Sequence, residues 1–257
     1  MSAPPSGPSD APPPDDADDA SAGAAGLDHL DDLDEDGAEA APAAVAPAPA
    51  VDGARQQAAA AEDPRYLRCF IAINFPVPTV RRIADQVSAL VPQIAAAGLT
   101  VRWVPAANIH LTLRFLGPVR PEAVEAIQAR LADGLRGARP FDLDVRGLGA
   151  FPGPVGPRVL WVGVREQPAL RAVQREVEAW MQELGFARDE RPYRPHATIG
   201  RVTGGRAEPA DLTALLGEQQ NRGFGTGRVN EVVIYESRTL AKGAEYRPLA
   251  RVPLLGK

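Results

Sequence analysis

A four-residue pattern occurs twice in the chain, and it constrains the fold more than any other sequence feature. His110-Leu111-Thr112-Leu113 and His196-Ala197-Thr198-Ile199 each alternate a polar with an apolar side chain. Because successive side chains of a strand point to opposite faces, the histidine and threonine share one face and the apolar pair shares the other. We therefore expect two similar halves, each with a strand that buries one face and presents an imidazole and a hydroxyl on the other.

Strands and helices alternate in the surrounding sequence, which predicts an α+β fold. Strands are expected where β-branched and aromatic residues cluster, over residues 66–74, 109–115, 141–149, 158–164, 196–202, 231–235 and 246–254. Helices are expected where apolar residues recur at helical spacing, over residues 80–97, 121–135, 167–184 and 209–216. Pro92 is expected to end or kink the first helix. We predict two pseudo-symmetric lobes, roughly residues 66–150 and 151–257, each an antiparallel sheet flanked by helices, around a central groove.

Composition changes sharply near residue 64. Residues 1–63 consist mainly of Ala, Pro, Gly and Asp, contain no aromatic residue, and hold fifteen acidic residues against Arg55 alone, a net charge of −14. Such a segment offers too little apolar surface to offset the entropy of ordering the chain. We predict a disordered acidic tail at residues 1–63, in which His29 is solvated, and a folded domain at residues 64–257.

The folded domain has the opposite charge. Its 194 residues carry a net charge of +9, and nearly all of the basic residues are arginines. Positive charge of this kind attracts polyanions such as RNA, without regard to sequence. The whole-chain value of −5 conceals this, because it adds the acidic tail to the basic domain.

Other classes of protein are excluded by simple counts. The single cysteine, Cys69, rules out an internal disulfide and a thiolate zinc cluster, and its apolar surroundings predict a buried residue. No apolar run approaches the roughly 18 residues that a membrane span needs. The N-terminus lacks the basic and apolar regions of a secretory signal. We expect a cytoplasmic protein that does not bind a membrane, and a monomer because few large apolar stretches are exposed.

Two facing histidines suit the in-line cleavage of a phosphodiester by water. One imidazole accepts a proton from the water and the other donates a proton to the leaving oxygen, and both titrate near neutrality. Threonine hydroxyls and a nearby arginine can bind the phosphate oxygens. No metal or cofactor is required, and two histidines without carboxylate or thiolate neighbours are a poor metal site.

One His-x-Thr pattern in a strand is more often structural than catalytic. The second copy, with the same alternation and a downstream arginine, favours catalysis. We interpret Trp103 and Trp161 as core residues and Arg114 as a solvated residue of its strand. The near symmetry of the two motifs does not show which histidine is the acid.

The motifs and their flanks resemble the two-histidine (2H) phosphoesterase superfamily, specifically the RNA 2′,3′-cyclic phosphodiesterases once called 2′-5′ RNA ligases (LigT-like). The resemblance covers nearly all of residues 66–255. It is carried by segments at residues 70–73, 110–117, 157–161, 191–201, 236–237 and 243–246.

This resemblance implies hydrolysis of terminal 2′,3′-cyclic phosphates on RNA to 2′-phosphomonoesters, without a metal. By the family's pattern His110 is the proton donor and His196 the proton acceptor. Thr112 and Thr198 would bind the phosphate, and Arg201 would assist. RNA ends or cyclic nucleotides are then the expected partners.

Several alternatives stay open at this point. Phe115, or an aromatic residue of the loop at 151–157, is expected to stack on a base, but core packing is an equal alternative. The chain could be a related 2H enzyme acting on another cyclic or 2′-5′ phosphodiester. It could also be a non-catalytic RNA-binding module of the same fold. The intact histidines favour an enzyme, because a binding module has no use for two opposed acid–base groups.

Overall fold

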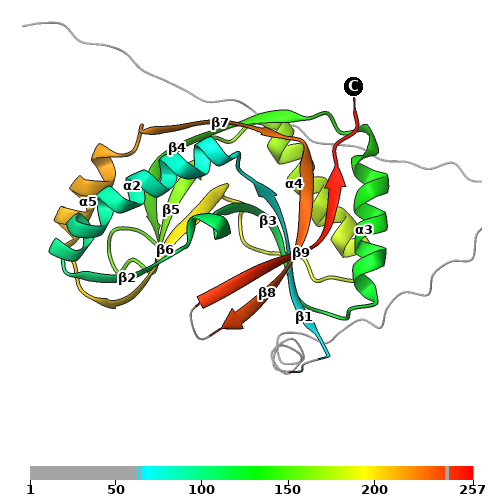
Figure 1. Ribbon diagram of the computed structural model, residues 1–257, viewed down its shortest axis with the longest axis horizontal. Helices are drawn as coiled ribbons and strands as arrows, with labels where there is room; N and C mark the ends of the chain where they lie inside the picture. Colours follow the sequence, from blue (N-terminus) through cyan, green and yellow to red (C-terminus); the bar gives the residue numbers. More distant parts are fainter. Residues whose placement is uncertain (1–62, 64, 241–242, 257) are drawn as a thin grey trace, which may run out of the picture. The chain divides into compact units, whose positions relative to one another are not determined.

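The computed structural model describes residues 63, 65–240 and 243–256, which form two antiparallel sheets with helices packed against them (Figure 1). The strands are β1 (Leu67–Asn74), β2 (Leu99–Trp103), β3 (His110–Val119), β4 (Phe141–Phe151), β5 (Val159–Val164), β6 (His196–Gly205), β7 (Gly223–Val229), β8 (Glu231–Leu240) and β9 (Gly243–Pro253). The helices are α2 (Val77–Ala96), α3 (Ala123–Gly134), α4 (Pro168–Glu183) and α5 (Pro209–Glu218), with short 3₁₀ turns η1 (Ala106–Asn108) and η2 (Leu135–Gly137). The tail predicted for residues 1–63, with His29, lies outside the described residues except for Asp63.

The two sheets differ in size. One has four strands in the order β3-β1-β8-β9, and the other has five in the order β2-β6-β5-β4-β7. All neighbouring pairs are antiparallel. Helix α2 packs on β2 and β7 and α5 on β4, whereas α3 packs on β9 and α4 on β3 and β4. The predicted α+β fold of antiparallel sheets flanked by helices is confirmed.

The predicted division into sequential lobes at residues 150 and 151 does not match the sheets. Strands β1 and β3 pair with β8 and β9 from the C-terminal end, as in the register that places Ile71 opposite Ile234. Strands β2 and β4 join β5, β6 and β7 in the other sheet. The physical reason is that the C-terminal hairpin returns to cover the open side of β1, which leaves no exposed backbone there.

Strands β2 and β7 are not among the strands predicted from the sequence, and Pro92 does not end helix α2. Strand β7 contains three glycines, which weaken strand propensity, yet it pairs along its length with β4. Strand β2 is only five residues long and pairs with β6. Helix α2 continues through Pro92 to Ala96, because the buried Leu90 and Ile94 hold its last turns against the core.

Buried apolar side chains from both sheets and from every described helix form one core cluster, and Cys69 lies in it as predicted. Helix α4 shows how the sequence produces this packing. Leu170, Val173, Val177 and Met181 recur at helical spacing and are buried, while the opposite face of the helix is polar. Within the described part of the chain, no helix is both long enough and apolar enough to cross a membrane.

Candidate active site

The two His-x-Thr motifs begin two strands with the same burial pattern. Strand β3 starts at His110 and β6 at His196, and the first six positions of each are partly buried, buried, partly buried, buried, buried and exposed. The strands come from different sheets and contact each other. The predicted alternation is therefore present in both strands, and the packing of the sheets brings the two motifs together.

His110 is held in one orientation by backbone and aromatic contacts. Its Nδ1 lies 2.8 Å from the carbonyl oxygen of Asn108, and because a carbonyl only accepts, Nδ1 carries the hydrogen. The side chain of Asn108 in turn donates to the carbonyl of Ala244 at 2.7 Å. Phe70 stacks on the imidazole with ring centroids 4.8 Å apart, and Tyr246 meets it edge-on at 5.1 Å.

His196 is held in a corresponding way. Its Nδ1 donates to the carbonyl oxygen of Arg194 at 2.6 Å, again two residues earlier in the chain. Phe151 meets the ring edge-on at 4.9 Å, and Trp161 lies behind at 6.4 Å. In both motifs the Nδ1 hydrogen is used within the protein, so that Nε2 is the nitrogen able to exchange a proton with a substrate, and in His110 this Nε2 also contacts the Thr112 hydroxyl.

Both imidazoles have pKa values below the ordinary value. For His110 the first cause is burial, which disfavours the charged ring, and the charge on His196 lowers the pKa further. For His196 burial again dominates, and the positive charge of Arg201 adds to it. In each case the hydrogen bond to the backbone carbonyl acts in the opposite direction and raises the pKa.

The predicted site residues line one cavity of about 1250 Å³. Both histidines, Thr112, Thr198, Arg201 and Phe115 all contribute to its walls. The Thr112 hydroxyl lies 3.1 Å from Nε2 of His110. Arg201 is the exposed sixth residue of β6, and its positive charge acts to lower the pKa values of both His196 and Tyr246.

Phe115 and Trp161, for which core packing was considered, do not lie in the centre of the core. Phe115 has 55% of its surface exposed, which removes the core alternative for this residue. Trp161 is only partly buried, and its ring lies 5.3 Å from Phe151, beside His196 rather than in the centre of the core. Trp103 is also partly buried but packs against the core as expected.

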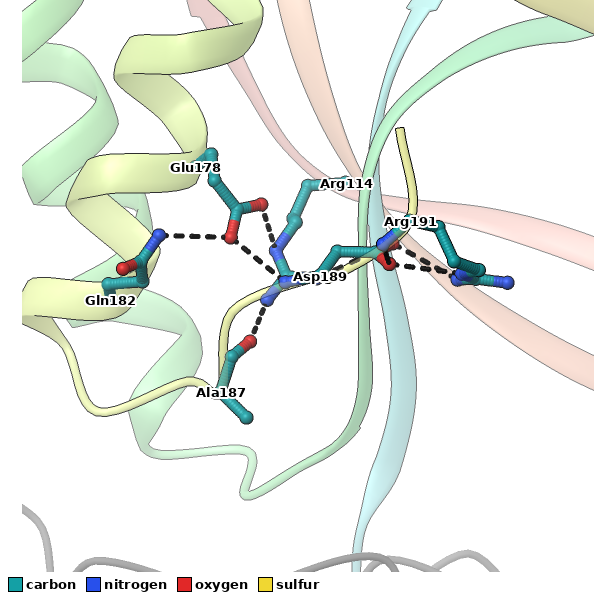
Figure 2. Close-up of polar contacts among 6 residues, drawn as sticks. All are labelled: Arg114, Glu178, Gln182, Ala187, Asp189 and Arg191. Atoms are coloured by element: carbon teal, nitrogen blue, oxygen red, sulfur yellow. Dashed lines mark hydrogen bonds and ion pairs between the residues drawn. The ribbon is translucent and has the colours of Figure 1, made fainter. Parts of the chain in front are cut away.

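The interpretation of Arg114 as a solvated residue is wrong. Its side chain is 7% exposed and crosses from β3 to α4, where Nε lies 2.8 Å from Glu178 Oε2 (Figure 2). It also donates to the carbonyl of Ala187 and lies 3.9 Å from Asp189. Glu178 accepts further hydrogen bonds from the Asp189 backbone N–H and from Gln182, both at 3.1 Å. This set of contacts, the Arg114 clamp, joins β3, α4 and the loop that follows α4.

Sequence reasoning missed the groups that orient the imidazoles and the Arg114 clamp. The carbonyls of Asn108 and Arg194 carry no side-chain signature, so only the repeated spacing of two residues before each histidine could have indicated them. Glu178 and Asp189 are 64 and 75 residues from Arg114, too far apart for any local pattern. Among the described residues, no group of three or more His, Cys, Asp or Glu side chains is placed to hold a metal ion.

A family model described as the 2′-5′ RNA ligase superfamily matches residues 79–239. The RNA 2′,3′-cyclic phosphodiesterase of Methanothermobacter thermautotrophicus is 36% identical over 180 residues, which are 70% of this chain and 95% of that protein. The protein of the same description from Aeropyrum pernix is 38% identical over 160 residues, 62% of this chain and 89% of that protein. The crystal structure of E. coli LigT complexed with 3′-AMP is similar with a TM-score of 0.59 and 27% identity, covering 74% of this chain and 98% of that one.

The matched residues include both His-x-Thr motifs and most of the residues that line the cavity. The similarity to the archaeal relatives spans nearly their whole length. The chain therefore belongs to the 2′-5′ RNA ligase superfamily.

Proposed function

We propose that the protein is an RNA 2′,3′-cyclic phosphodiesterase that hydrolyses terminal cyclic phosphates to 2′-phosphomonoesters. The observation that carries the proposal is the pair of imidazoles on one cavity, each with Nδ1 bound to a backbone carbonyl, so that Nε2 is the nitrogen able to transfer a proton. The relatives named for this activity support it, and a LigT relative has been crystallised with a nucleoside monophosphate.

In the proposed reaction, water attacks the phosphorus in line with the bond to the ribose O3′. Nε2 of neutral His196 accepts a proton from the water as the new P–O bond forms. The P–O3′ bond breaks, and Nε2–H of protonated His110 donates the proton that the leaving O3′ requires. The product is a 2′-phosphate with a free 3′-hydroxyl. The two histidines exchange protonation states and return to the start by proton exchange with solvent.

Burial disfavours the charged form of both imidazoles, and one charged neighbour distinguishes them. The positive charge of Arg201 lowers the pKa of His196 and so favours its neutral, proton-accepting form. A neutral His196 removes the charge that would otherwise lower the pKa of His110, which helps His110 to carry the proton. The near-symmetric motifs are thus distinguished by a cation that stands beside only one of them.

The remaining groups would stabilise charge on the phosphate. Thr112 and Thr198 lie on the cavity wall beside the imidazoles, where their hydroxyls can donate to non-bridging oxygens. Arg201 is placed to neutralise the charge that develops as water attacks. Phe115, exposed on the same cavity, offers a face on which the terminal base can stack.

The experiment that tests the proposal offers the purified protein an RNA that ends in a 2′,3′-cyclic phosphate. We expect a 2′-phosphate product, and His110→Ala and His196→Ala should each lose at least about 10²-fold in kcat, as is typical of a general acid or base. A 3′-phosphate product would indicate a relative with different regiochemistry. Binding without turnover would indicate an RNA-binding module, and near-normal turnover by either alanine variant would contradict the mechanism.

The proposal includes independence from metals. Two imidazoles supply both proton transfers, so no metal-activated water is needed. Hydrolysis of a 2′,3′-cyclic mononucleotide should therefore keep its rate after dialysis against EDTA. Activity that is lost on dialysis and returns only with an added divalent ion would refute this part of the proposal. The expectations of a monomer and of a cytoplasmic location stay predictions.

A further inference from the structure

The cavity that holds the two motifs extends well beyond them. Its volume of about 1250 Å³ exceeds the roughly 300–1,000 Å³ of pockets that enclose a single small ligand. From His196 its wall continues along the loop between α4 and β6, residues 184–195, and onto the polar face of α4. A terminal nucleotide between the histidines would leave this part of the cavity unfilled.

The charge of the cavity wall is unbalanced. Eight arginines and three carboxylates line it. Three of the arginines, Arg114, Arg171 and Arg191, form ion pairs with carboxylates. The other five make no ion pair within the described part of the chain: Arg68, Arg175, Arg188, Arg194 and Arg201. Of the three carboxylates, Glu178 and Asp189 are ion-paired, and Glu190 is in no ion pair among the described residues. Five unpaired arginines against one unpaired carboxylate leave the cavity wall with excess positive charge.

Three of the unpaired arginines lie on the part of the cavity wall formed by α4 and the loop at residues 184–195. Arg194 is two residues before His196 and binds it through its own carbonyl. Arg188 lies further back in the same loop, and Arg175 lies on α4 one helical turn before Glu178. All three side chains are exposed and line the cavity.

The Arg114 clamp supports this part of the cavity wall. Arg114, Glu178 and Asp189 hold the loop to α4 and β3 (Figure 2). Arg188 lies in the sequence between Ala187 and Asp189, the two loop residues that Arg114 contacts. At the other end of the loop, the Pro195 carbonyl accepts a hydrogen bond from Val164 N–H at 3.1 Å. The exposed arginines thus project from a braced backbone, which reduces the conformational entropy that binding would cost.

We propose that Arg175, Arg188 and Arg194 form a second subsite, which binds internucleotide phosphates of the RNA strand. This inference rests on the proposed function and adds to it the direction in which the substrate extends. A 2′,3′-cyclic phosphate is possible only at a 3′ end, so every further phosphate of the substrate lies on its 5′ side. The subsite would make an oligonucleotide a better substrate than a cyclic mononucleotide through tighter binding.

The kinetic test compares two substrates in the variant Arg175→Gln/Arg188→Gln/Arg194→Gln. We expect kcat/KM for a short single-stranded RNA with a cyclic phosphate end to fall at least about tenfold more than kcat/KM for a 2′,3′-cyclic mononucleotide, through a rise in KM. An equal fall for both substrates would overturn the inference, because the arginines would then serve the terminal nucleotide or the fold.

A binding test does not depend on turnover. The same RNA with a 2′-phosphate end is titrated against wild type and variant at several salt concentrations. Each lost phosphate contact should reduce the slope of log K against log salt by about 0.7 for a single strand, so the triple variant should lose about 2. An unchanged slope would refute the subsite whether or not the protein is a hydrolase.

A matched control removes the same charge elsewhere. Arg120, Arg136 and Arg228 are exposed, are ion-paired, and lie outside the cavity wall. Their triple glutamine variant should keep the wild-type ratio of the two kcat/KM values and the wild-type salt slope. A loss equal to that of the cavity variant would show a general charge effect and overturn the inference. Failure of wild type to hydrolyse either substrate would instead refute the proposed function, while the salt slope would still test the subsite.

Discussion

The protonation of the two imidazoles follows from groups within a few ångströms of each ring. The carbonyls of Asn108 and Arg194 hold the hydrogen on Nδ1, and burial lowers both pKa values below the ordinary value of about 6.5. Catalysis by an acid and a base needs one ring protonated and the other neutral. In the free protein that state is most populated between the two pKa values of the pair.

This predicts a maximum of kcat/KM below about pH 6.5, because kcat/KM reports the ionisation of the free protein. The acidic limb arises when both rings are protonated and the basic limb when both are neutral. The maximum of kcat should lie at higher pH, since a bound phosphate anion favours the charged ring. Rate profiles for a 2′,3′-cyclic mononucleotide measure both, and a kcat/KM maximum above pH 7 would contradict the prediction.

A second prediction at this scale concerns Arg201. Its positive charge lowers the pKa of His196, so Arg201→Gln should raise that pKa. The chain has only three histidines, so NMR titration can follow each ring separately. The His29 signal, from outside the matched family region, serves as the internal control and should not move. A His196 pKa that is unchanged or lower in the variant would show that Arg201 does not act on this ring.

At the scale of secondary structure, β3 and β6 share the His-x-Thr motif at their first four positions. Their fifth and sixth positions have the same burial but different residue types. The fifth position of each strand is buried and is occupied by Arg114 in β3 and by Gly200 in β6. The sixth is exposed in both, as Phe115 and Arg201. One strand therefore adds an apolar face to the cavity and the other a positive charge, which gives two equivalent histidines unequal surroundings.

Arg114, at the buried fifth position of β3, is expected to contribute to the stability of the fold. Arg114→Met should lower the free energy of unfolding by about 3–5 kcal/mol, because it leaves Glu178 without the partner that compensates its burial. Denaturation in urea measures this. Arg136→Met removes an exposed ion pair and should change stability by no more than about 1 kcal/mol. Equal, small effects of both substitutions would show that the Arg114 clamp contributes little to folding.

At the scale of the whole molecule, the candidate site exists only because strands from distant parts of the chain meet. Strands β3 and β6 lie in different sheets, and each sheet contains strands from both halves of the sequence. The cavity wall takes residues from strands of both halves, from β1 and β3 as well as from β6, β8 and β9. The groups around His196 all come from residues 151–257, whereas those around His110 come from both halves. His110, for example, packs between Phe70 and Tyr246 from opposite ends of the folded region.

The charge of residues 1–63 leads to a prediction at this scale. Deletion of residues 1–60 should leave the turnover of a cyclic mononucleotide unchanged and tighten the binding of RNA, because negative charge on the same chain opposes the approach of a polyanion to the basic domain. Titration with RNA that ends in a 2′-phosphate measures the change. A tail of the same length with its acidic residues replaced by Asn and Gln should match the deletion, and weaker binding by the truncated protein would contradict the prediction.

The sequence by itself determined which side chains supply the proposed chemistry, and it determined most of the secondary structure. Polar and apolar alternation placed His110 and Thr112 on one face of a strand, and helical spacing predicted the buried side of α4. These signals are local, since a strand or helix repeats within a few residues. The charge of +9 on the folded domain likewise follows from counting residues.

Only the tertiary structure decided which strands pair and which distant groups meet. The pairing of β1 with β8 and the contacts of Arg114 with Glu178 and Asp189 connect residues that share no sequence pattern. Such contacts form because buried edges and buried charges must find partners, and many distant residues could serve. Selection among those candidates depends on the packing of the complete core, which no local segment of the sequence encodes.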